Sequence, residues 1–181
     1  AVAATGHSNP RVTRAAQAQL AKLPHAMGDV HPHPLKGQLA RELSKLTFER
    51  WKRGRGKTIF CNSGFEAVEA ALKTALLATG KKGVIAFEGA YHGLGYGALA
   101  TTHRKHFRNP FKKQLGKFGH FALYPTTADE LAETKKQIKA LFKKHPIGAI
   151  LAEPIQGRAG IRVPPPEFIG LLRRLCDRYG V

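Results

Sequence analysis

The chain has 181 residues, 43% of them hydrophobic, which is enough for one folded domain with a core. No apolar run approaches the length of about 20 residues that a membrane-spanning helix needs, so no membrane segment is expected. Thirty Lys and Arg against twelve Asp and Glu give a formal net charge of +18, which favours polyanion contacts at low salt. These basic residues are spread without any nucleic-acid recognition pattern, so we expect solvated basic surfaces and no specific nucleic-acid partner.

The cysteine and histidine patterns exclude a disulfide framework and favour no metal site. Two isolated cysteines, Cys61 and Cys176, indicate a reducing, cytoplasmic compartment. Cys61 is expected to be a buried small hydrophobic side chain. The pairs His31/His33 and His103/His106 lack a second ligand pair at a recognisable spacing, so no metal is expected.

The beginning of the chain carries no pattern typical of a signal peptide, because it lacks a basic start and a long apolar centre. The only Met is Met27. We therefore expect the sequence to be a part of a longer protein.

The first part of the chain is expected to be helical. Asn9 and Pro10 predict a helix start, since Asn caps well and Pro suits the first helical position. This helical pattern fades at Pro24. A second helix, ending before Gly54, is predicted by leucines spaced four and three residues apart: Leu35, Leu39, Leu43 and Leu46. Residues 1–50 are expected to form an N-terminal arm that leads into a main domain of residues 51–181.

From Thr58 onward, short apolar runs alternate with helical patterns. The runs expected to be strands are Thr58–Cys61, Gly83–Phe87, Phe121–Tyr124 and Ile147–Ala152. The expected helices are Glu66–Thr79, one opened by the capping box Thr127–Glu130, and one that follows Pro164–Pro166 and ends at Gly180. Such alternation predicts an α/β fold in three layers, with a mostly parallel sheet covered on both faces.

Three short motifs follow expected strands, at Phe60–Ala67, Glu88–Gly93 and Glu153–Gly157. Ligands of α/β proteins bind at the carboxyl ends of parallel strands, so these motifs are candidates for a site. The first motif passes directly into a helix. Because the first turn of a helix leaves backbone N–H groups free at its positive end, this motif is predicted to bind phosphate.

Together and in this order, the three motifs resemble the first half of the large domain of class-III aminotransferases, which are pyridoxal-phosphate (PLP) enzymes of fold type I. The resemblance extends from Gly6 to Val181. It implies the three-layer, mostly parallel large domain of that fold, present incompletely, and pyridoxal 5'-phosphate as cofactor. It implies that Ser63, Gly64 and Phe65 cradle the phosphate, although Phe65 lacks the hydroxyl that Thr or Ser supplies in many members.

The resemblance also implies roles for the other two motifs. It places Tyr91 and His92 in the cofactor-binding turn, with the Tyr91 ring stacked on the cofactor at a gain of about 1 kcal/mol. It places Glu153 and Gln156 on the substrate side, and Arg158 where some members have Glu, which reverses a charge near the substrate entrance. Each role has an alternative without a ligand. Ser63–Phe65 could be an ordinary strand-to-helix turn, Tyr91 a half-buried loop aromatic, and Glu153 a carboxylate that caps local backbone donors.

The family's two catalytic residues have no counterpart in this chain. They are an Asp that binds the pyridine nitrogen and a Lys that bonds to the cofactor. No catalytic residue is therefore assigned, and the chain alone is expected to be inactive. The family's strand order further predicts that later strands separate Thr58–Cys61 from Ile147–Ala152, and Ile147–Ala152 from Gly83–Phe87, which would leave strand edges unpaired and the isolated chain poorly stable.

The implied function is transamination from an amino donor to a 2-oxo acid such as 2-oxoglutarate, by a homodimer. The family favours donors whose amine lies at the far end of a carbon chain. Aminomutase, racemase or decarboxylase chemistry on the same fold is the first alternative. A non-catalytic truncated remnant and a basic polyanion-binding module are the others.

Overall fold

The computed structural model describes residues 3–28 and 30–181, which fall into two compact units. The first unit ends at Thr58 and the second runs from Ile59 to Val181. The sequence predicted a boundary between residues 50 and 51. Among the described residues, no helix is both long enough and apolar enough to cross a membrane.

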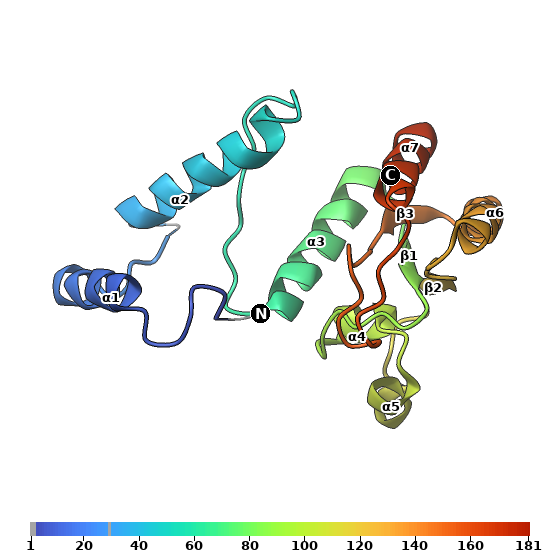
Figure 1. Ribbon diagram of the computed structural model, residues 1–181, viewed down its shortest axis with the longest axis horizontal. Coiled ribbons are helices and arrows are strands. Elements are labelled where there is room, and N and C mark those ends of the chain that lie inside the picture. The colour runs from blue at the N-terminus through green and yellow to red at the C-terminus, as the bar shows by residue number, and fades with distance from the viewer. Residues whose placement is uncertain (1–2, 29) are drawn as a thin grey trace. The chain divides into compact units, whose positions relative to one another are not determined.

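The described residues of the first unit form two helices and a terminal turn (Figure 1). Helix α1 (Pro10–Lys22) begins as predicted, because the Asn9 side chain accepts the N–H of Arg11 at 3.0 Å. Helix α2 (Pro34–Ser44) begins after His33, whose Nδ1 accepts the N–H of Leu35 at 3.2 Å. Helix α2 continues into a π-helical turn, η1 (Lys45–Glu49), so the helical stretch ends before Gly54 as expected.

A parallel three-stranded sheet forms the centre of the second unit, in the order β2-β1-β3. The central strand β1 (Gly83–Phe87) pairs with β2 (Gly119–Ala122) on one side and with β3 (Ile147–Ile150) on the other. All five residues of β1 are buried. This burial on both faces explains why the strand is an uninterrupted apolar run in the sequence. Strand β2 begins at Gly119 rather than at the expected Phe121.

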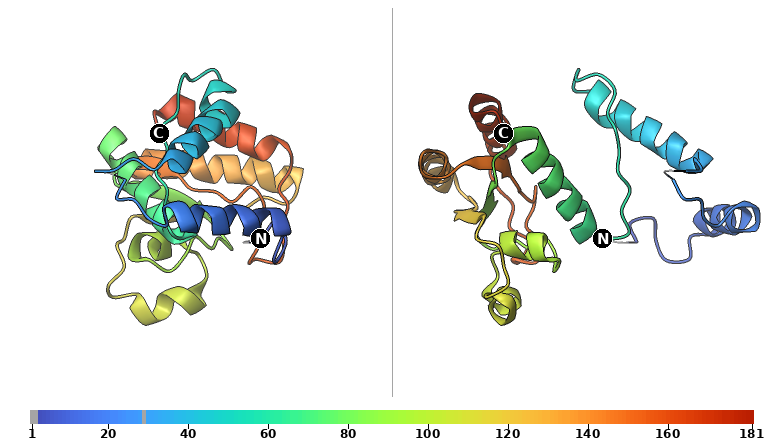
Figure 2. Two further views of the ribbon diagram at one scale, coloured as in Figure 1. Left: turned by 90° about the vertical axis from the view of Figure 1, so that its left-hand side faces the viewer. Right: turned by 180° about the vertical axis from the view of Figure 1, so that it is seen from behind.

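Helices cover both faces of this sheet, which confirms the three-layer α/β prediction (Figures 1 and 2). One face carries α3, and the opposite face carries α6 and α7, while short helices occupy the connection between β1 and β2. The bounds are α3 Gly64–Thr79, α4 Tyr96–Thr101, α5 Lys105–Arg108, η2 Asn109–Phe111, α6 Ala128–Lys144 and α7 Glu167–Tyr179.

The core lies between the sheet and helices α6 and α7, and aromatic rings occupy its centre. The Phe87 ring lies 5.2 Å from that of Phe168 and 6.1 Å from that of Tyr124, centroid to centroid, both in edge-to-face geometry. All three side chains are fully buried. Such a ring cluster adds to the burial of apolar area and fixes the carboxyl end of β1, after which the second motif begins.

Two sequence predictions about strands are wrong. No strand forms at Thr58–Cys61 in the described chain, where Ile59 is 70% exposed and Cys61 is exposed rather than buried. The segment has no described strand beside it to pair its backbone groups, which an extended run needs. Strand β3 does pair directly with β1, with Val84 opposite Ala149, so no other strand separates them. Both edges of the central strand are therefore satisfied within this chain.

Candidate functional site

The beginning of α3 and the loop after β1 together line an open hollow of about 550 Å³. All five residues predicted to bind the cofactor lie in this lining, although they come from two motifs that are separated in the sequence. The lining residues are Ser63, Gly64, Phe65, Val68, Tyr91, His92, Gly93 and Leu94.

The N-terminus of α3 presents free backbone donors to this hollow. The Ser63 hydroxyl accepts the N–H of Glu66 at 3.4 Å, and the Ser63 carbonyl accepts the N–H of Ala67 at 3.2 Å. Within the described part of the chain, no acceptor pairs with the N–H of Gly64 or Phe65. A side chain placed at Gly64 would meet nothing within 4 Å, so this backbone faces open space. Two free N–H groups at the positive end of a helix suit a phosphate.

Gly93 allows the loop after β1 to lie directly against α3. Its φ is +120°, and a Cβ added there would lie 2.3 Å from the Cβ of Phe65. The same contact is continued by the Glu69 carboxylate, which accepts the N–H of Ala98 at 2.9 Å. Only glycine combines this backbone conformation with so close an approach, so Gly93 sets how the first two motifs meet.

His92 is held inside this loop as a neutral side chain. Its backbone N–H donates to the Thr102 hydroxyl at 2.9 Å, and its buried Nε2 has no partner among the described residues. Burial lowers the pKa of His92 to about 4. The imidazole is therefore uncharged near neutral pH.

This burial predicts a loss of stability in acid. Between pH 6.5 and about 4 the unfolded chain protonates His92 and the folded chain does not, so the free energy of unfolding falls as the pH falls. Between pH 7.5 and 4.5 we expect a loss of roughly 2–3 kcal/mol from this residue. His92→Gln should remove that part, as measured by urea unfolding of the whole protein at both pH values. Burial also lowers the pKa values of His103 and His120. The free energy of unfolding of the variant should therefore still fall with falling pH, but less steeply. An unchanged slope would contradict the prediction.

Glu153 connects the loop after β1 to the loop after β3. Its Oε1 accepts the N–H of Tyr91 at 3.0 Å, and its Oε2 accepts the N–H of Gly157 at 3.3 Å. Glu153 thus caps nearby backbone donors, which is the alternative role that the sequence left open for this carboxylate. They also fix the backbone of Tyr91 at the hollow. Contact of Glu153 with a substrate remains a prediction.

Gln156 makes a second link between the same two loops. Its side chain is 1% exposed, its Nε2 donates to the Glu88 carbonyl at 2.8 Å, and its Oε1 accepts from Arg162 at 3.4 Å. Arg162 in turn donates to the Tyr124 carbonyl at 2.9 Å. Gln156 is thus a buried support for the site, and its contact with a substrate also remains a prediction.

The surroundings of the Tyr91 ring include Phe107, which the sequence did not single out, and Arg158, whose contact with the ring could not be predicted. The ring centroid of Tyr91 lies 5.2 Å from that of Phe107 and 4.6 Å from the guanidinium carbon of Arg158. Phe107 lies in the connection between β1 and β2 and Arg158 in the one after β3, so no local sequence pattern relates the two residues. Val68 and Leu94 were also missed, although Val68 follows Phe65 at helical spacing and Leu94 directly follows the second motif.

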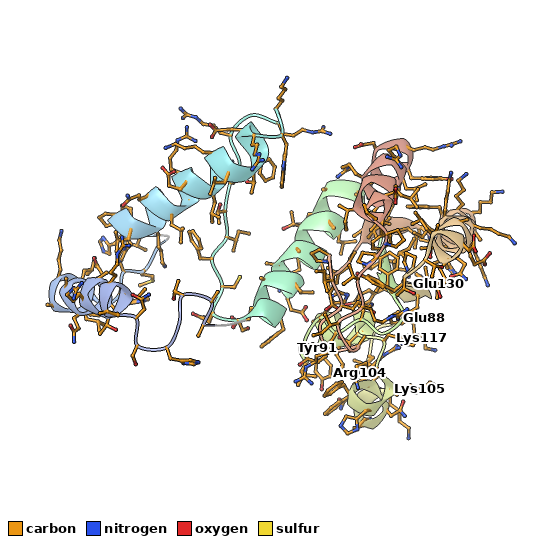
Figure 3. The ribbon with its side chains drawn as sticks, in the orientation of Figure 1. Glu88, Tyr91, Arg104, Lys105, Lys117 and Glu130 are labelled. Atoms are coloured by element: carbon orange, nitrogen blue, oxygen red, sulfur yellow. The ribbon has the colours of Figure 1, made fainter. Side chains whose placement is uncertain are left out.

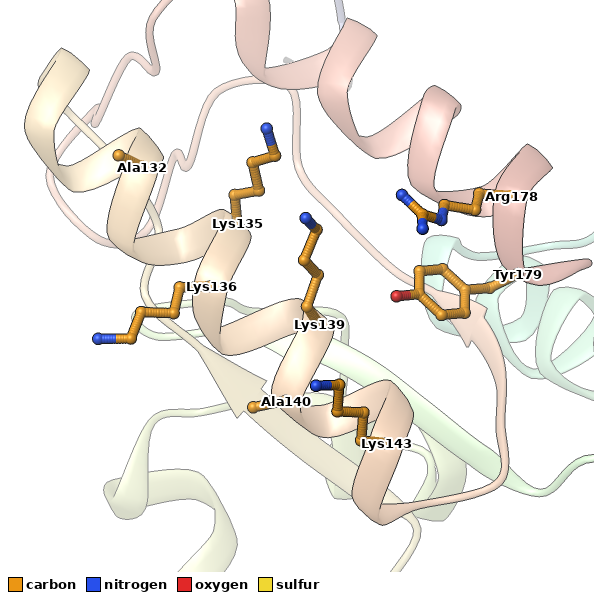
Figure 4. Close-up of a pocket in the computed structure, with 8 residues that line it drawn as sticks. All are labelled: Ala132, Lys135, Lys136, Lys139, Ala140, Lys143, Arg178 and Tyr179. Carbon is orange, nitrogen blue, oxygen red and sulfur yellow. The ribbon is translucent and has the colours of Figure 1, made fainter.

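A second hollow, between α6 and α7, has a different character (Figure 4). Lys135, Lys139 and Lys143 lie along α6 and face Arg178 and Tyr179 of α7. No carboxylate belongs to its lining. This second hollow carries part of the excess positive charge. A solvated basic surface of this kind attracts anions without selecting among them.

Comparisons with known proteins show which family and which solved structures the chain is similar to. The family model for class-III aminotransferases matches residues 1–181. An acetylornithine aminotransferase of Methanopyrus kandleri is 36% identical over 181 residues, which are 100% of this chain and 43% of that protein. A PLP-bound amine transaminase from an uncultivated Pseudomonas species aligns with a TM-score of 0.85 and 28% identity, over 97% of this chain and 43% of its own.

A further solved structure supports the fold alone. It is the taurine:2-oxoglutarate aminotransferase of Bifidobacterium kashiwanohense in complex with PLP and glutamate, with a TM-score of 0.88 and 22% identity. The alignment covers 97% of this chain and 42% of that protein. The chain therefore spans less than half the length of each of these proteins.

The residues of the hollow fit the cofactor that the family and the PLP-bound neighbour indicate, pyridoxal phosphate. The free N–H groups of Gly64 and Phe65 suit its phosphate, and the aromatic and aliphatic lining suits its ring. No lysine belongs to the lining of this hollow.

Proposed function

We propose that the protein containing this chain is a PLP-dependent transaminase, because the chain belongs to the class-III aminotransferase family. The observation that carries the proposal is the hollow in which the free N–H groups of α3 meet the turn that contains Tyr91. A phosphate donor set and an aromatic ring are thus presented to one space. An amino donor and a 2-oxo acid would be the substrates.

Each motif has a part in holding the cofactor. Gly64 and Phe65 would bind the phosphate through backbone N–H groups, and Tyr91, which lines the hollow, would orient the cofactor ring. Glu153 keeps the Tyr91 backbone in place, and neutral His92 is fixed in the same loop by the hydrogen bond from its N–H to Thr102. When bound, the cofactor supplies an electron sink for the carbon that carries the amino group.

The donor is proposed to carry its amine at the end of a carbon chain, and 2-oxoglutarate is the proposed acceptor. The support is the 36% identity of the chain to an acetylornithine aminotransferase. Aminomutase, racemase or decarboxylase chemistry would use the same hollow. Product analysis separates them, because only transamination leaves a keto or aldehyde product of the donor together with a newly aminated acceptor.

We further propose that this chain acts as a part of a longer, homodimeric, cytoplasmic protein and is inactive alone. The support is that no lysine lines the hollow, so the covalent anchor for the cofactor would come from elsewhere. Two free cysteines are compatible with a reducing compartment.

Titration of the whole protein with PLP, followed by absorbance, tests the proposal. We expect binding in the wild type and a roughly fivefold weaker affinity in Tyr91→Ala, since ring stacking contributes about 1 kcal/mol. Tyr91→Phe keeps the ring and is the matched control, and His92→Ala should lose less affinity than Tyr91→Ala. A whole protein that stays colourless in excess PLP would overturn the proposed function.

A further inference from the structure

Arg158 is held against two aromatic rings at the edge of the candidate site. Its guanidinium carbon lies 4.6 Å from the Tyr91 ring centroid and 5.6 Å from that of Phe107. Arg104 donates a hydrogen bond to the Arg158 carbonyl, which ties the loop after β3 to the segment before α5. Figure 3 shows Arg104 and Tyr91 on the same side of the second unit. Two rings and a backbone contact thus position a guanidinium group whose residue is exposed.

This guanidinium has no carboxylate partner among the described residues. Glu153, five positions earlier, is engaged with the N–H groups of Tyr91 and Gly157. Stacking on an aromatic face leaves the in-plane N–H donors of an arginine available. Those donors form the planar fork that matches a carboxylate in two parallel hydrogen bonds.

The hollow itself offers no counter-charge to an anionic substrate. Its lining contains glycines, aliphatic and aromatic side chains, Ser63 and the partly buried His92, and no Lys or Arg. Arg158 supplies a positive charge beside this lining, because its guanidinium group lies against the ring of Tyr91. A substrate carboxylate near Tyr91 would therefore meet Arg158.

We propose that Arg158 is a specificity-determining residue, which binds the carboxylate of an anionic amino substrate at the Tyr91 side of the hollow. This inference rests on the proposed function, because it assumes that amino substrates react there. Arg158 acts through a charged bidentate contact, so an amine that lacks the carboxylate gains nothing from it. The selectivity between the two kinds of donor is thus the property that Arg158 controls.

The test compares Arg158→Gln with the wild type in the whole PLP-loaded protein. Pentanoate, an unreactive carboxylate, is titrated calorimetrically, and we expect the variant to bind it roughly 10- to 100-fold more weakly. The kcat/KM ratio of 5-aminopentanoate to pentylamine should fall by a similar factor, because these donors differ only in the carboxylate. PLP affinity should stay nearly unchanged, and Arg158→Lys should restore part of the ratio.

Lys105→Gln is the matched control, since it removes one positive charge from the same region without touching Tyr91. Equal losses in Lys105→Gln and Arg158→Gln would show a general field and overturn the inference. So would an equal fall for both donors in Arg158→Gln, which is the sign of a purely structural role. A wild type that binds PLP without binding pentanoate refutes this inference alone. A wild type that binds no PLP refutes the proposed function, and this inference with it.

Discussion

Replacing Gly93 by alanine is expected to abolish PLP binding and to destabilise the second unit. The φ of +120° strains any residue with a side chain, at a cost of about 1–3 kcal/mol. The new methyl group would lie 2.3 Å from the Cβ of Phe65, and such overpacking adds roughly 1–3 kcal/mol. A combined loss of roughly 2–6 kcal/mol is large against a typical stability of about 5–15 kcal/mol. Relief of the clash would move the second motif away from α3 and open the hollow.

Gly157→Ala is the control for this experiment. Gly157 lies in the third motif, but a Cβ there would meet nothing within 4 Å, and its φ is not positive. Urea unfolding and PLP titration of the whole protein should therefore separate the two variants. If Gly93→Ala unfolds at the wild-type urea concentration and binds PLP normally, the close contact with Phe65 does not hold the site.

Local sequence signals predicted most of the elements because each one depends on neighbouring residues. Thr127 caps α6 by accepting the N–H of Glu130 at 3.2 Å, and Gly180 ends α7 in the left-handed conformation. A strand depends on a partner as well as on its own sequence. Thr58–Cys61 has the composition of a strand and forms none, and the pairing of β3 with β1 could not be read from either strand alone.

The candidate site divides in the same way. The second and third motifs could be predicted to converge, because loops at the carboxyl ends of adjacent parallel strands share one edge of the sheet. The first motif follows no strand in the described part of the chain, and its place beside the second depends on the close contact between Gly93 and Phe65. Which side chains then touch could not be predicted. Arg158 was visible in the sequence as a reversed charge, but its stacking on Tyr91 depends on the path of two loops that start from different strands. The inward position of Gln156 likewise depends on the Glu88 carbonyl that it binds.

Glu153→Ala is expected to loosen the second motif from the third, leaving the hydrogen bond from Gln156 to the Glu88 carbonyl as the remaining link. The substitution leaves the N–H groups of Tyr91 and Gly157 without their acceptor. Hydrogen bonds to a charged group contribute about 1.5–3 kcal/mol each. Because Glu153 is only half-buried and water can replace part of the loss, we expect a combined destabilisation of roughly 2–4 kcal/mol.

Hydrogen exchange of the Tyr91 and Gly157 amides locates this effect, since loss of the acceptor should speed exchange there before the core responds. Glu153→Gln keeps one acceptor oxygen and should give an intermediate rate. Glu88→Ala removes an exposed carboxylate from the same loop and should leave both amides protected. If Glu88→Ala speeds these amides as much as Glu153→Ala does, the link between the loops is not made by Glu153. If only Glu153 variants do so and PLP affinity falls with them, the carboxylate acts on the cofactor by fixing the backbone that carries Tyr91.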